Sequence, residues 1–227
     1  MKKSIAVLLT VLLMTLMVTP AFAAEPQFMK AEQLSDEALL MMAKLNVDQR
    51  SDAVKAVSKI HATASVQGLT RASGIDAEVY VVTLLEDRQV LADGKIVETY
   101  STTAVSSPLS HTESQISQAG AVYARINYEY VIELDEMRVK MIDSDHKIVN
   151  QNSTANSMYV TNSIYRNYNT GENENSRTIS NPSNNSWYTL YAKNTSSFPR
   201  ANTITGCETT GYFGSGGSVY VECLVEV

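Results

Sequence analysis

Apolar and polar positions alternate most regularly between residues 122 and 134, where every second residue is apolar or aromatic and most of the others are polar. A period of two is typical of a β-strand with one buried face and one solvent-exposed face. The alternation resumes after Asp135-Glu136. A two-residue turn at that point predicts a hairpin with three apolar pairs: Leu134 with Met137, Ile132 with Val139, and Tyr130 with Met141.

Two runs of β-branched and aliphatic residues, 75–90 and 96–105, flank Asp93-Gly94. Asp-Gly between such runs indicates a β-hairpin, because both central residues of its turn need positive φ. The first run does not alternate cleanly, since residues 79–82 are all apolar or aromatic. We therefore expect either that both faces of this strand are covered or that a β-bulge shifts its register.

A third hairpin is predicted at the C-terminus, where residues 203–213 and 217–227 flank a Gly-Ser-Gly loop. Centring this hairpin on Ser215 places Cys207 directly opposite Cys223. We expect these two residues, the only cysteines of the chain, to form a structural disulfide across a non-hydrogen-bonded pair. In the loop-entropy model such a bridge stabilises the fold by about 3 kcal/mol.

Before residue 75 the apolar positions follow a helical period. Ser35 precedes two acidic residues, which is typical of a helix N-terminus. We predict two short amphipathic helices, or one bent helix, over residues 35–62. Their apolar stripe is expected to pack against the core, and the alternative is a leader that shields the β region before secretion. The stripe consists of Ala38, Met41, Met42, Leu45, Ala53, Ala56, Val57 and Ile60.

The first 23 residues are typical of a secretory signal peptide. Lys2-Lys3 precede an uncharged run of fourteen residues, and Ala21-Phe22-Ala23 supplies an A-x-A cleavage site. The run is shorter than the ~20 residues that a transmembrane helix needs. We therefore expect a secreted, extracellular protein whose mature chain begins at Ala24 and has no transmembrane segment.

These patterns predict a mainly β fold, an antiparallel β-sandwich preceded by a short N-terminal helical segment. Residues 150–202 are rich in Asn and Ser, and are expected to form short strands joined by polar loops. The predicted organisation is a signal peptide at 1–23, a helical segment or leader at 24–74, and an antiparallel β domain at 75–227.

Composition narrows the functional classes. The chain carries a formal net charge of −6, and loss of Lys2 and Lys3 with the signal peptide makes the mature charge −8. This acidic excess argues against a nucleic-acid partner. The hydrophobic fraction of 44% is ordinary for a folded chain, and two cysteines are too few for a disulfide-dense scaffold.

The sequence shows no catalytic constellation, and we assign no catalytic residue, metal ligand or cofactor. His61, His111 and His146 belong to no H-E-x-x-H motif and lie near no G-x-S-x-G elbow, so they are interpreted as surface residues. Asp143-Ser144-Asp145 begins like a calcium loop but lacks the Gly and closing Glu of an EF-hand. The hypothesis that two of the carboxylates hydrolyse a glycoside stays open, but nothing in the sequence selects a pair. The acidic residues are densest at Glu133, Asp135, Glu136, Asp143 and Asp145.

Aromatic residues are the best candidates for binding. Trp187, Tyr188 and Tyr191 cluster in one Asn- and Ser-rich stretch. Rigid aromatic side chains on a loop of a β scaffold can bind a sugar face or a protein surface. The alternative is that Trp187 plugs one end of the sandwich.

Four features of the chain carry a family resemblance: the Lys2-Lys3 signal, residues 99–104, the Tyr-rich strand at 122–134 and the Cys207…Cys223 hairpin. Over about residues 75–227 the layout resembles small exported proteins of low-GC Gram-positive bacteria. The resemblance implies a compact β-sandwich and, for some such proteins, an interaction with a host, the envelope or a competitor. It implies no catalytic residue.

We therefore expect a non-enzymatic extracellular or envelope recognition protein that uses Trp187, Tyr188 and Tyr191 to bind a glycan, an envelope component or a protein surface. The alternative is a secreted antimicrobial or toxin-like effector whose leader, 24–74, is removed. A hydrolase is a third hypothesis, which no constellation of residues supports.

Overall fold

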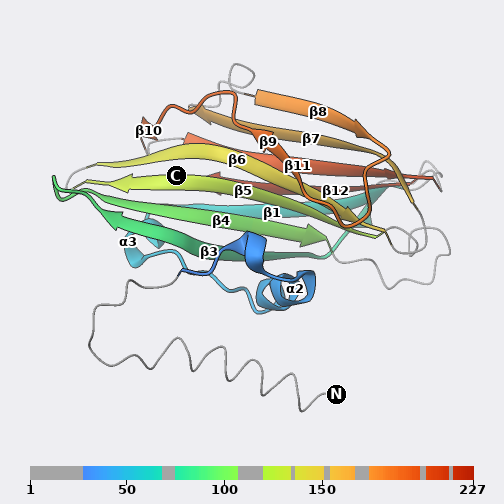
Figure 1. Cartoon of the computed structure of the whole chain (residues 1–227), viewed down its shortest axis with the longest axis horizontal. Coiled ribbons are helices and arrows are strands. Elements are labelled where there is room, and N and C mark those ends of the chain that lie inside the picture. The colour runs from blue at the N-terminus through green and yellow to red at the C-terminus, as the bar shows by residue number, and fades with distance from the viewer. Residues whose placement is uncertain are drawn as a thin grey trace, which may run out of the picture.

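Two antiparallel β-sheets packed face to face form most of the protein (Figure 1). This computed structural model describes residues 28–67, 75–106, 120–133, 136–150, 154–166, 174–199, 203–214 and 217–227. The prediction of an antiparallel β-sandwich preceded by a short helical segment is confirmed. The predicted signal peptide, His111 and Asp135 lie outside the described residues.

Sheet A has the spatial order β10-β6-β5-β4-β3, and β9 also pairs with β6. Its hairpin around Asp93-Gly94 forms as predicted, with Gly94 at φ 82°. Neighbouring strands of this sheet pair in antiparallel orientation. The strands are β3 (Val79–Val90), β4 (Ile96–Ser106), β5 (Ala121–Ile132), β6 (Met137–Val149), β9 (Tyr188–Tyr191) and β10 (Phe198–Pro199).

Sheet B has the order β2-β1-β12-β11-β7-β8, again with antiparallel neighbours. In the C-terminal hairpin, the register places Tyr212 opposite Ser218 and Cys207 opposite Cys223, as predicted from centring it on Ser215. The strands are β1 (Lys59–Gln67), β2 (Ile75–Asp76), β7 (Ala155–Arg166), β8 (Glu174–Ser180), β11 (Thr203–Phe213) and β12 (Ser218–Glu226).

Three short helices precede the sandwich: η1 (Ala31–Gln33), α2 (Asp36–Lys44) and α3 (Asp52–Lys55). The Ser35 hydroxyl caps α2 by accepting a hydrogen bond from the Ala38 amide at 3.3 Å. The second predicted helix is wrong beyond α3, because the chain enters strand β1 at Lys59. The physical reason is visible in residues 59–67, where small or apolar residues alternate with polar ones and the whole segment pairs with β12. Sheet B therefore includes part of the segment 24–74.

Both faces of β3 are covered, and the strand also has a bulge. Val82 and Leu84 pack beneath Leu39 and Ala43 of α2, whereas Val79, Val81 and Leu85 pack toward the core between the sheets. The register with β4 shifts between Leu85 and Asp87. The run of apolar residues that breaks the alternation in the sequence thus has both of the physical causes that we expected.

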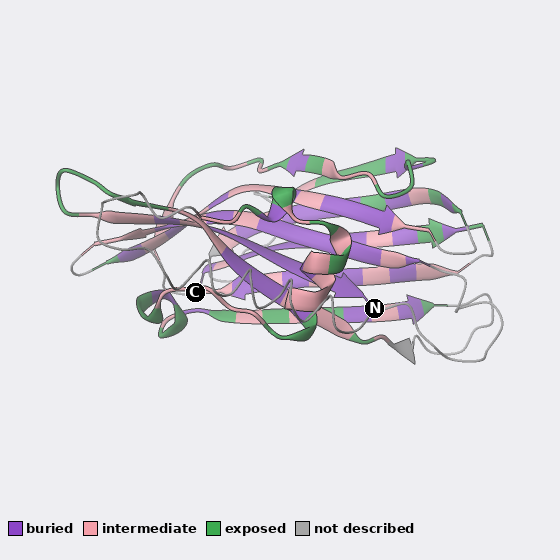
Figure 2. Cartoon of the chain, turned by 60° about the horizontal axis from the view of Figure 1, so that its bottom comes forward, coloured by how far each residue is buried: buried purple, intermediate pink, exposed green. Residues whose placement is uncertain are grey.

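Strand β5 was predicted to have one buried and one solvent-exposed face, but both of its faces are buried over part of its length. Val122, Ala124 and Ile126 face the core, but Tyr123 and Arg125 on the opposite face are each only 3% exposed. The long purple stretches of the central strands in Figure 2 show this burial on both faces. The cause is tertiary, because α2 and Trp187 cover this end of the outer face of sheet A.

The hairpin between β5 and β6 forms in a different register from the predicted one. Ile132 pairs with Met137 and Tyr130 pairs with Val139, so each apolar partner differs from the prediction by two residues. The Glu133 amide donates to the Glu136 carbonyl at 2.8 Å, which continues the observed register toward the end of the hairpin. A shift of two residues leaves each side chain on the same face, so the hydrophobic pattern could not distinguish the two registers.

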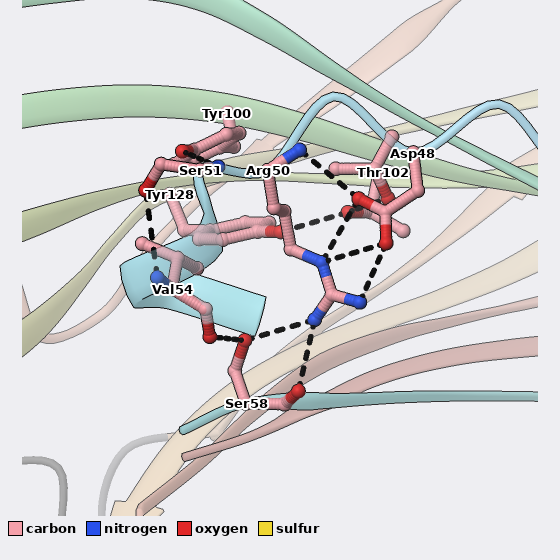
Figure 3. Close-up of polar contacts among 9 residues, drawn as sticks. Asp48, Arg50, Ser51, Val54, Ser58, Tyr100, Thr102 and Tyr128 are labelled. Carbon is pink, nitrogen blue, oxygen red and sulfur yellow. Dashed lines mark hydrogen bonds and ion pairs between the residues drawn. The ribbon is translucent and has the colours of Figure 1, made fainter. Parts of the chain in front are cut away.

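Residues 47–58 cross from edge strand β3 to β1 and close one side of the sandwich. The Arg50 guanidinium, 10% exposed, pairs with Asp48 at 2.7 Å. It also donates to the carbonyl and hydroxyl oxygens of Ser58 at 3.0 and 2.8 Å (Figure 3). The Ser51 hydroxyl donates to the buried Glu98 carboxylate on β4 at 2.7 Å. These contacts tie the two ends of the segment together and fasten it to β4.

Candidate functional site

The outer face of sheet B is a broad polar surface on which no described helix packs. Contacts of α2 are with β3 and β4 of sheet A, and Figure 1 shows the helices on that side of the sandwich. Alternate residues of β12 and β11 point inward and are buried, so the residues between them point outward. We call the following outward residues the tyrosine–glutamate face: Thr63, Tyr159, Thr161, Glu208, Thr210, Tyr212, Tyr220 and Glu222.

At the centre of this face, Glu208 of β11 lies directly opposite Glu222 of β12. Thr203 and Val227 exchange two backbone hydrogen bonds, of 3.3 and 2.8 Å, in the same register. Hydrogen-bonded and non-hydrogen-bonded pairs alternate along an antiparallel ladder, so Glu208 and Glu222 occupy a non-hydrogen-bonded pair. Side chains approach most closely at such a pair, with Cα atoms about 4.5 Å apart. The two carboxylates are therefore close neighbours.

The environment of the pair favours a proton on Glu208. Burial raises the pKa of this carboxyl, and the charge of Glu222 raises it further. Thr161 and Tyr220 hydrogen-bond to Glu208, and the Thr63 hydroxyl donates to Glu222 at 3.1 Å. Within the described residues neither carboxylate forms an ion pair. Among the residues that the structure describes, hydroxyl groups donate to the pair and no cation lies within ion-pair distance.

Tyr159 and Tyr220 lie one cross-strand row from the carboxylates, and Tyr212 lies four residues from Glu208 along β11. Tyr159 is 37% exposed and Tyr212 is 45% exposed, while Tyr220 is half-buried. Thr210 lies between Tyr159 on β7 and Tyr220 on β12 in one cross-strand row. The backbone positions of Tyr159 and Tyr220 are two strand spacings apart, which is about 10 Å. Burial and the two glutamates raise the pKa of the Tyr220 hydroxyl, which therefore stays a hydrogen-bond donor.

This combination suits a ligand with both apolar and donor-rich faces. Tyrosine offers a rigid ring that contacts apolar surface and a hydroxyl that hydrogen-bonds. An ionised carboxylate only accepts hydrogen bonds, so the oxygens of this pair that no protein hydroxyl reaches can accept donors such as hydroxyl groups from a ligand. Sugar rings present both kinds of surface. The face therefore carries the kinds of groups that contact a polyhydroxylated molecule.

The structure separates the three predicted aromatic binding residues. Trp187 packs in the cluster beneath α2, whereas Tyr188 packs against the core between the sheets. The Tyr188 hydroxyl accepts a hydrogen bond from the Ser183 amide at 2.6 Å. Tyr191 is 73% exposed. These side chains therefore form no common platform.

Trp187 has an internal role. Its ring centroid lies 4.0 Å from Cζ of Arg125 and 4.4 Å from Nζ of Lys147. Burial lowers the pKa of both cations. Lys147 pairs with Asp36 at the start of α2, and Arg125 lies 3.7 Å from Asp145. The indole ring thus lies over two buried cations, and their burial strengthens the cation–π attraction.

The acidic residues singled out in the sequence lie at two places on sheet A. The Asn127 amide donates to Asp143 at 2.6 Å and to Asp145 at 2.9 Å, and burial raises the pKa of Asp143. Glu133 and Glu136 lie near the β5–β6 turn and pair with Lys95 and Arg138. Among the described residues no three His, Cys, Asp or Glu side chains converge as a metal site would require.

His146 is a correction to the prediction of surface histidines. It is fully buried, and Thr209 Oγ1 and Ser144 Oγ each lie 2.7 Å from one of its ring nitrogens. Burial lowers its pKa to about 3, so the ring is neutral. The Ser144–His146 contact has the spacing of a nucleophile and its base, but both side chains are 0% exposed, so no substrate reaches them. His61 is exposed, 3.3 Å from Glu226.

The predicted disulfide is absent, although its register is confirmed. Cys207 and Cys223 are directly opposite each other, but both are buried free thiols. Because Thr203 and Val227 form a hydrogen-bonded pair, Cys207 and Cys223 do so too, contrary to the expected non-hydrogen-bonded pair. Side chains at such a pair stand farther apart, which explains the two separate thiols.

Sequence analysis missed the tyrosine–glutamate face because a period of two identifies the outward positions of a strand but not which strands lie side by side. The signal was present in β7, where Tyr159 and Thr161 alternate with Met158, Val160 and inward residues. No helix among the described residues is long and apolar enough to cross a membrane. Comparisons of the chain with protein-family models, with curated proteins and with solved structures find no match.

Proposed function

We propose that this protein acts outside the cell as a non-enzymatic recognition protein, and that it binds an envelope polysaccharide through the tyrosine–glutamate face. The observation that carries the proposal is that, among the described residues, exposed tyrosine rings share one sheet face with a carboxylate pair that forms no ion pair, and no helix packs on that face. The export signal at residues 1–23 and the resemblance to exported proteins of low-GC Gram-positive bacteria support an extracellular location.

A polysaccharide suits this face better than a protein partner does. The centres of protein–protein interfaces are depleted in charged residues and in serine. The outward positions around Glu208 and Glu222 carry mainly Ser, Thr, Tyr and Glu, with few apolar side chains. Such a surface has many hydrogen-bonding groups and little apolar area, which favours a hydroxyl-rich ligand over a protein.

The same pair supports a second candidate function, hydrolysis of a glycoside. The structure places Glu208 and Glu222 side by side on an open sheet face. Retaining glycosidases place two carboxyl groups about 5–5.5 Å apart and raise the pKa of the one that acts as an acid. The raised pKa of Glu208 next to Glu222 meets the second condition. Recognition remains the first proposal, because no described helix packs over the pair to exclude water.

The proposal is tested by co-sedimentation of the mature protein with purified peptidoglycan sacculi. We expect binding that is reduced about tenfold when Tyr159 and Tyr212 are both replaced by alanine, since aromatic anchors dominate binding energy. The matched control is Tyr191→Ala, which removes an exposed tyrosine from sheet A and should leave binding unchanged. Release of reducing ends from the same sacculi tests the hydrolase candidate, with Glu208→Gln as its control.

Equal loss of binding in the Tyr191→Ala protein would contradict the choice of face. Absence of binding to sacculi by the folded wild-type protein would overturn the recognition proposal itself. Reducing ends that appear with the wild type and vanish with Glu208→Gln would favour the hydrolase instead.

A further inference from the structure

We propose that residues 28–46, which we call the N-terminal strap, undock from sheet A in acid and uncover a surface of aromatic rings and buried cations. The strap contains η1 and α2 and lies on the outer face of sheet A, on the other side of the sandwich from the tyrosine–glutamate face (Figure 1). The inference goes beyond the proposed function, because it concerns the other sheet and needs no ligand.

The strap can leave without breaking either sheet. It contributes no strand, and among the described residues its backbone hydrogen-bonds to the sandwich only at Ala31. The chain is anchored directly after Asn46, where the Val47 carbonyl accepts from the Thr83 amide at 2.8 Å and the Gln49 amide donates to the Thr83 carbonyl at 3.0 Å. Segments with few such bonds open at a lower free energy than core strands do. The strap is therefore suited to local opening about a fixed end.

One ion pair with a buried partner holds the strap to the centre of the sheet. Asp36, at the start of α2, pairs with Lys147 of β6, whose side chain is 1% exposed. Among the described residues no other carboxylate lies within ion-pair distance of Lys147. Burial lowers the pKa of Lys147, so its charge is costly in the closed state. Asp36 offsets this cost only while it is ionised, because a buried charge without its partner is strongly destabilising.

The neighbouring charges make the closed state depend further on ionised carboxylates. Arg125 of β5 is a second buried cation, 3% exposed, and its charge disfavours that of Lys147. Tyr123 of β5 is uncharged, since burial raises its pKa to about 12. The carboxylates that face the two cations are Glu32, Asp36 and Glu37 on the strap, Glu86 on β3, and Asp145 on β6. Protonation of these groups leaves two like charges together under the strap.

A second contact of the strap also uses a carboxylate. The Ala31 amide donates to Oε1 of Glu86 at 2.9 Å, and an ionised carboxylate accepts a stronger hydrogen bond than a protonated one does. The apolar contacts of Leu39 and Ala43 with β3 do not change with pH. At the far end of α2, Lys44 lies over the ring of Tyr80 and stays charged in acid. The contacts that acid weakens are thus those at the N-terminal half of the strap.

Opening would uncover a surface that the neutral protein hides. The rings of Tyr123 and Trp187 meet edge to face with centroids 5.8 Å apart, in the cluster that α2 covers. Lys147 Nζ lies 4.6 Å from the Tyr123 centroid. Water that enters after undocking would solvate both cations, which compensates for the lost Asp36 contact.

Hydrogen exchange followed by mass spectrometry measures the opening in the mature protein. Asp36→Asn imitates protonation and should speed exchange of the α2 amides at neutral pH by at least about a hundredfold, the factor that corresponds to loss of one partner of a buried ion pair. Strands β5 and β6 should keep their wild-type protection, because the opening is local. Trp187, the only tryptophan of the chain, should become more accessible to acrylamide quenching.

Two further variants separate the ion pair from general effects. Asp52→Asn is the matched control, because Asp52 also lies in the first turn of a helix, α3, but in no ion pair among the described residues. It should leave exchange of α2 unchanged. Lys147→Met removes the buried charge that Asp36 offsets. Acidification to about pH 4, where carboxyl groups in general titrate, should therefore speed exchange of α2 less in this variant than in the wild type, after correction for the intrinsic rate.

Wild-type exchange of α2 in the Asp36→Asn protein would overturn the inference. Acceleration that is equal in α2, β5 and β6 would also overturn it, because the opening would then be global unfolding. If the Asp36→Asn protein does not fold, the Lys147→Met comparison decides. An acid response of α2 as large as that of the wild type would refute the role of the pair, and a smaller one would support it.

Discussion

Cys207 and Cys223 lie directly opposite each other at a hydrogen-bonded pair of the C-terminal hairpin, and both are free thiols in the core. The Cys223 thiol donates a weak hydrogen bond to the Thr102 carbonyl at 3.8 Å. The pair thus contributes packing between the two sheets rather than a covalent link. Its chemistry follows from burial, because a thiol reacts as the thiolate.

The thiols should be unreactive in the native protein and both reactive after unfolding. Burial raises the pKa of Cys223 to about 12 and that of Cys207 well above its usual value. At neutral pH a colorimetric disulfide reagent should therefore titrate no thiol in buffer and two in denaturant. A secreted protein that shows no thiol in denaturant, and regains two after reduction, would instead contain the bridge.

Replacing Trp187 by leucine should destabilise the protein by about 2 kcal/mol, the size of a desolvated cation–π interaction. The substitution removes the aromatic face above Arg125 and Lys147, which remain buried. Urea unfolding followed by circular dichroism measures the change. Tyr191→Leu is the control and should shift stability by less than about 0.5 kcal/mol, as an exposed site does.

Replacing Glu208 by glutamine should stabilise the protein at neutral pH. The folded-state pKa of Glu208 lies above its usual 4.5, so wild-type stability falls as pH rises from 4.5 through the raised pKa. The variant avoids this loss and should gain about 0.5–1 kcal/mol at neutral pH, the size of a cross-strand charge pair. Below pH 4.5, where both states of the wild type are protonated, the gain should disappear. A variant that is less stable than wild type at neutral pH would contradict repulsion between the carboxylates.

Buried His146 should make the protein sensitive to acid. Its pKa falls from 6.5 to about 3 on folding, so the unfolded state binds an extra proton between these values. Stability is complete above pH 6.5 and is lost as pH falls, with a slope approaching about 1.4 kcal/mol per pH unit. The stability deficit of a His146→Gln protein, measured by urea unfolding at several pH values, should shrink toward low pH. His61→Gln should retain the steep acid dependence, and a deficit for His146→Gln that is constant with pH would refute the explanation.

The working protein should retain the residues before 75, against the alternative of a removable leader. Leu39, Val54 and Val66 are 5% exposed or less, and β1 pairs along its whole length with β12. The intact mass of the protein from culture medium should correspond to a start near Ala24. A chain that begins at residue 75 lacks β1 and should fail to fold, because the edge of β12 is then exposed. A chain that begins at residue 28 should fold. A secreted form that starts near residue 70 would support the leader.

Part of the fold followed from local sequence rules alone. The Asp93-Gly94 hairpin and the register that places Cys207 opposite Cys223 depend on turn residues and on a period of two, which act over short distances. The same rules could have located β1, whose alternation from Lys59 to Gln67 was overlooked next to a helical stripe. These rules could not detect the two-residue shift in the β5–β6 hairpin, because such a shift keeps every side chain on the same face of the sheet.

Tertiary structure decided which outward strand faces stay exposed to solvent and which polar side chains come into contact. Strand β5 alternates like a half-exposed strand, yet Arg125 is buried because α2 and Trp187 cover it. His146 looked like a surface residue and lies in the core, since its position on β6 faces sheet B. The sequence by itself determined the export signal pattern, the period-two strands and an acidic chain. The predicted register of the C-terminal hairpin already placed Glu208 opposite Glu222. Only the tertiary structure decided that no described helix packs over their face of sheet B.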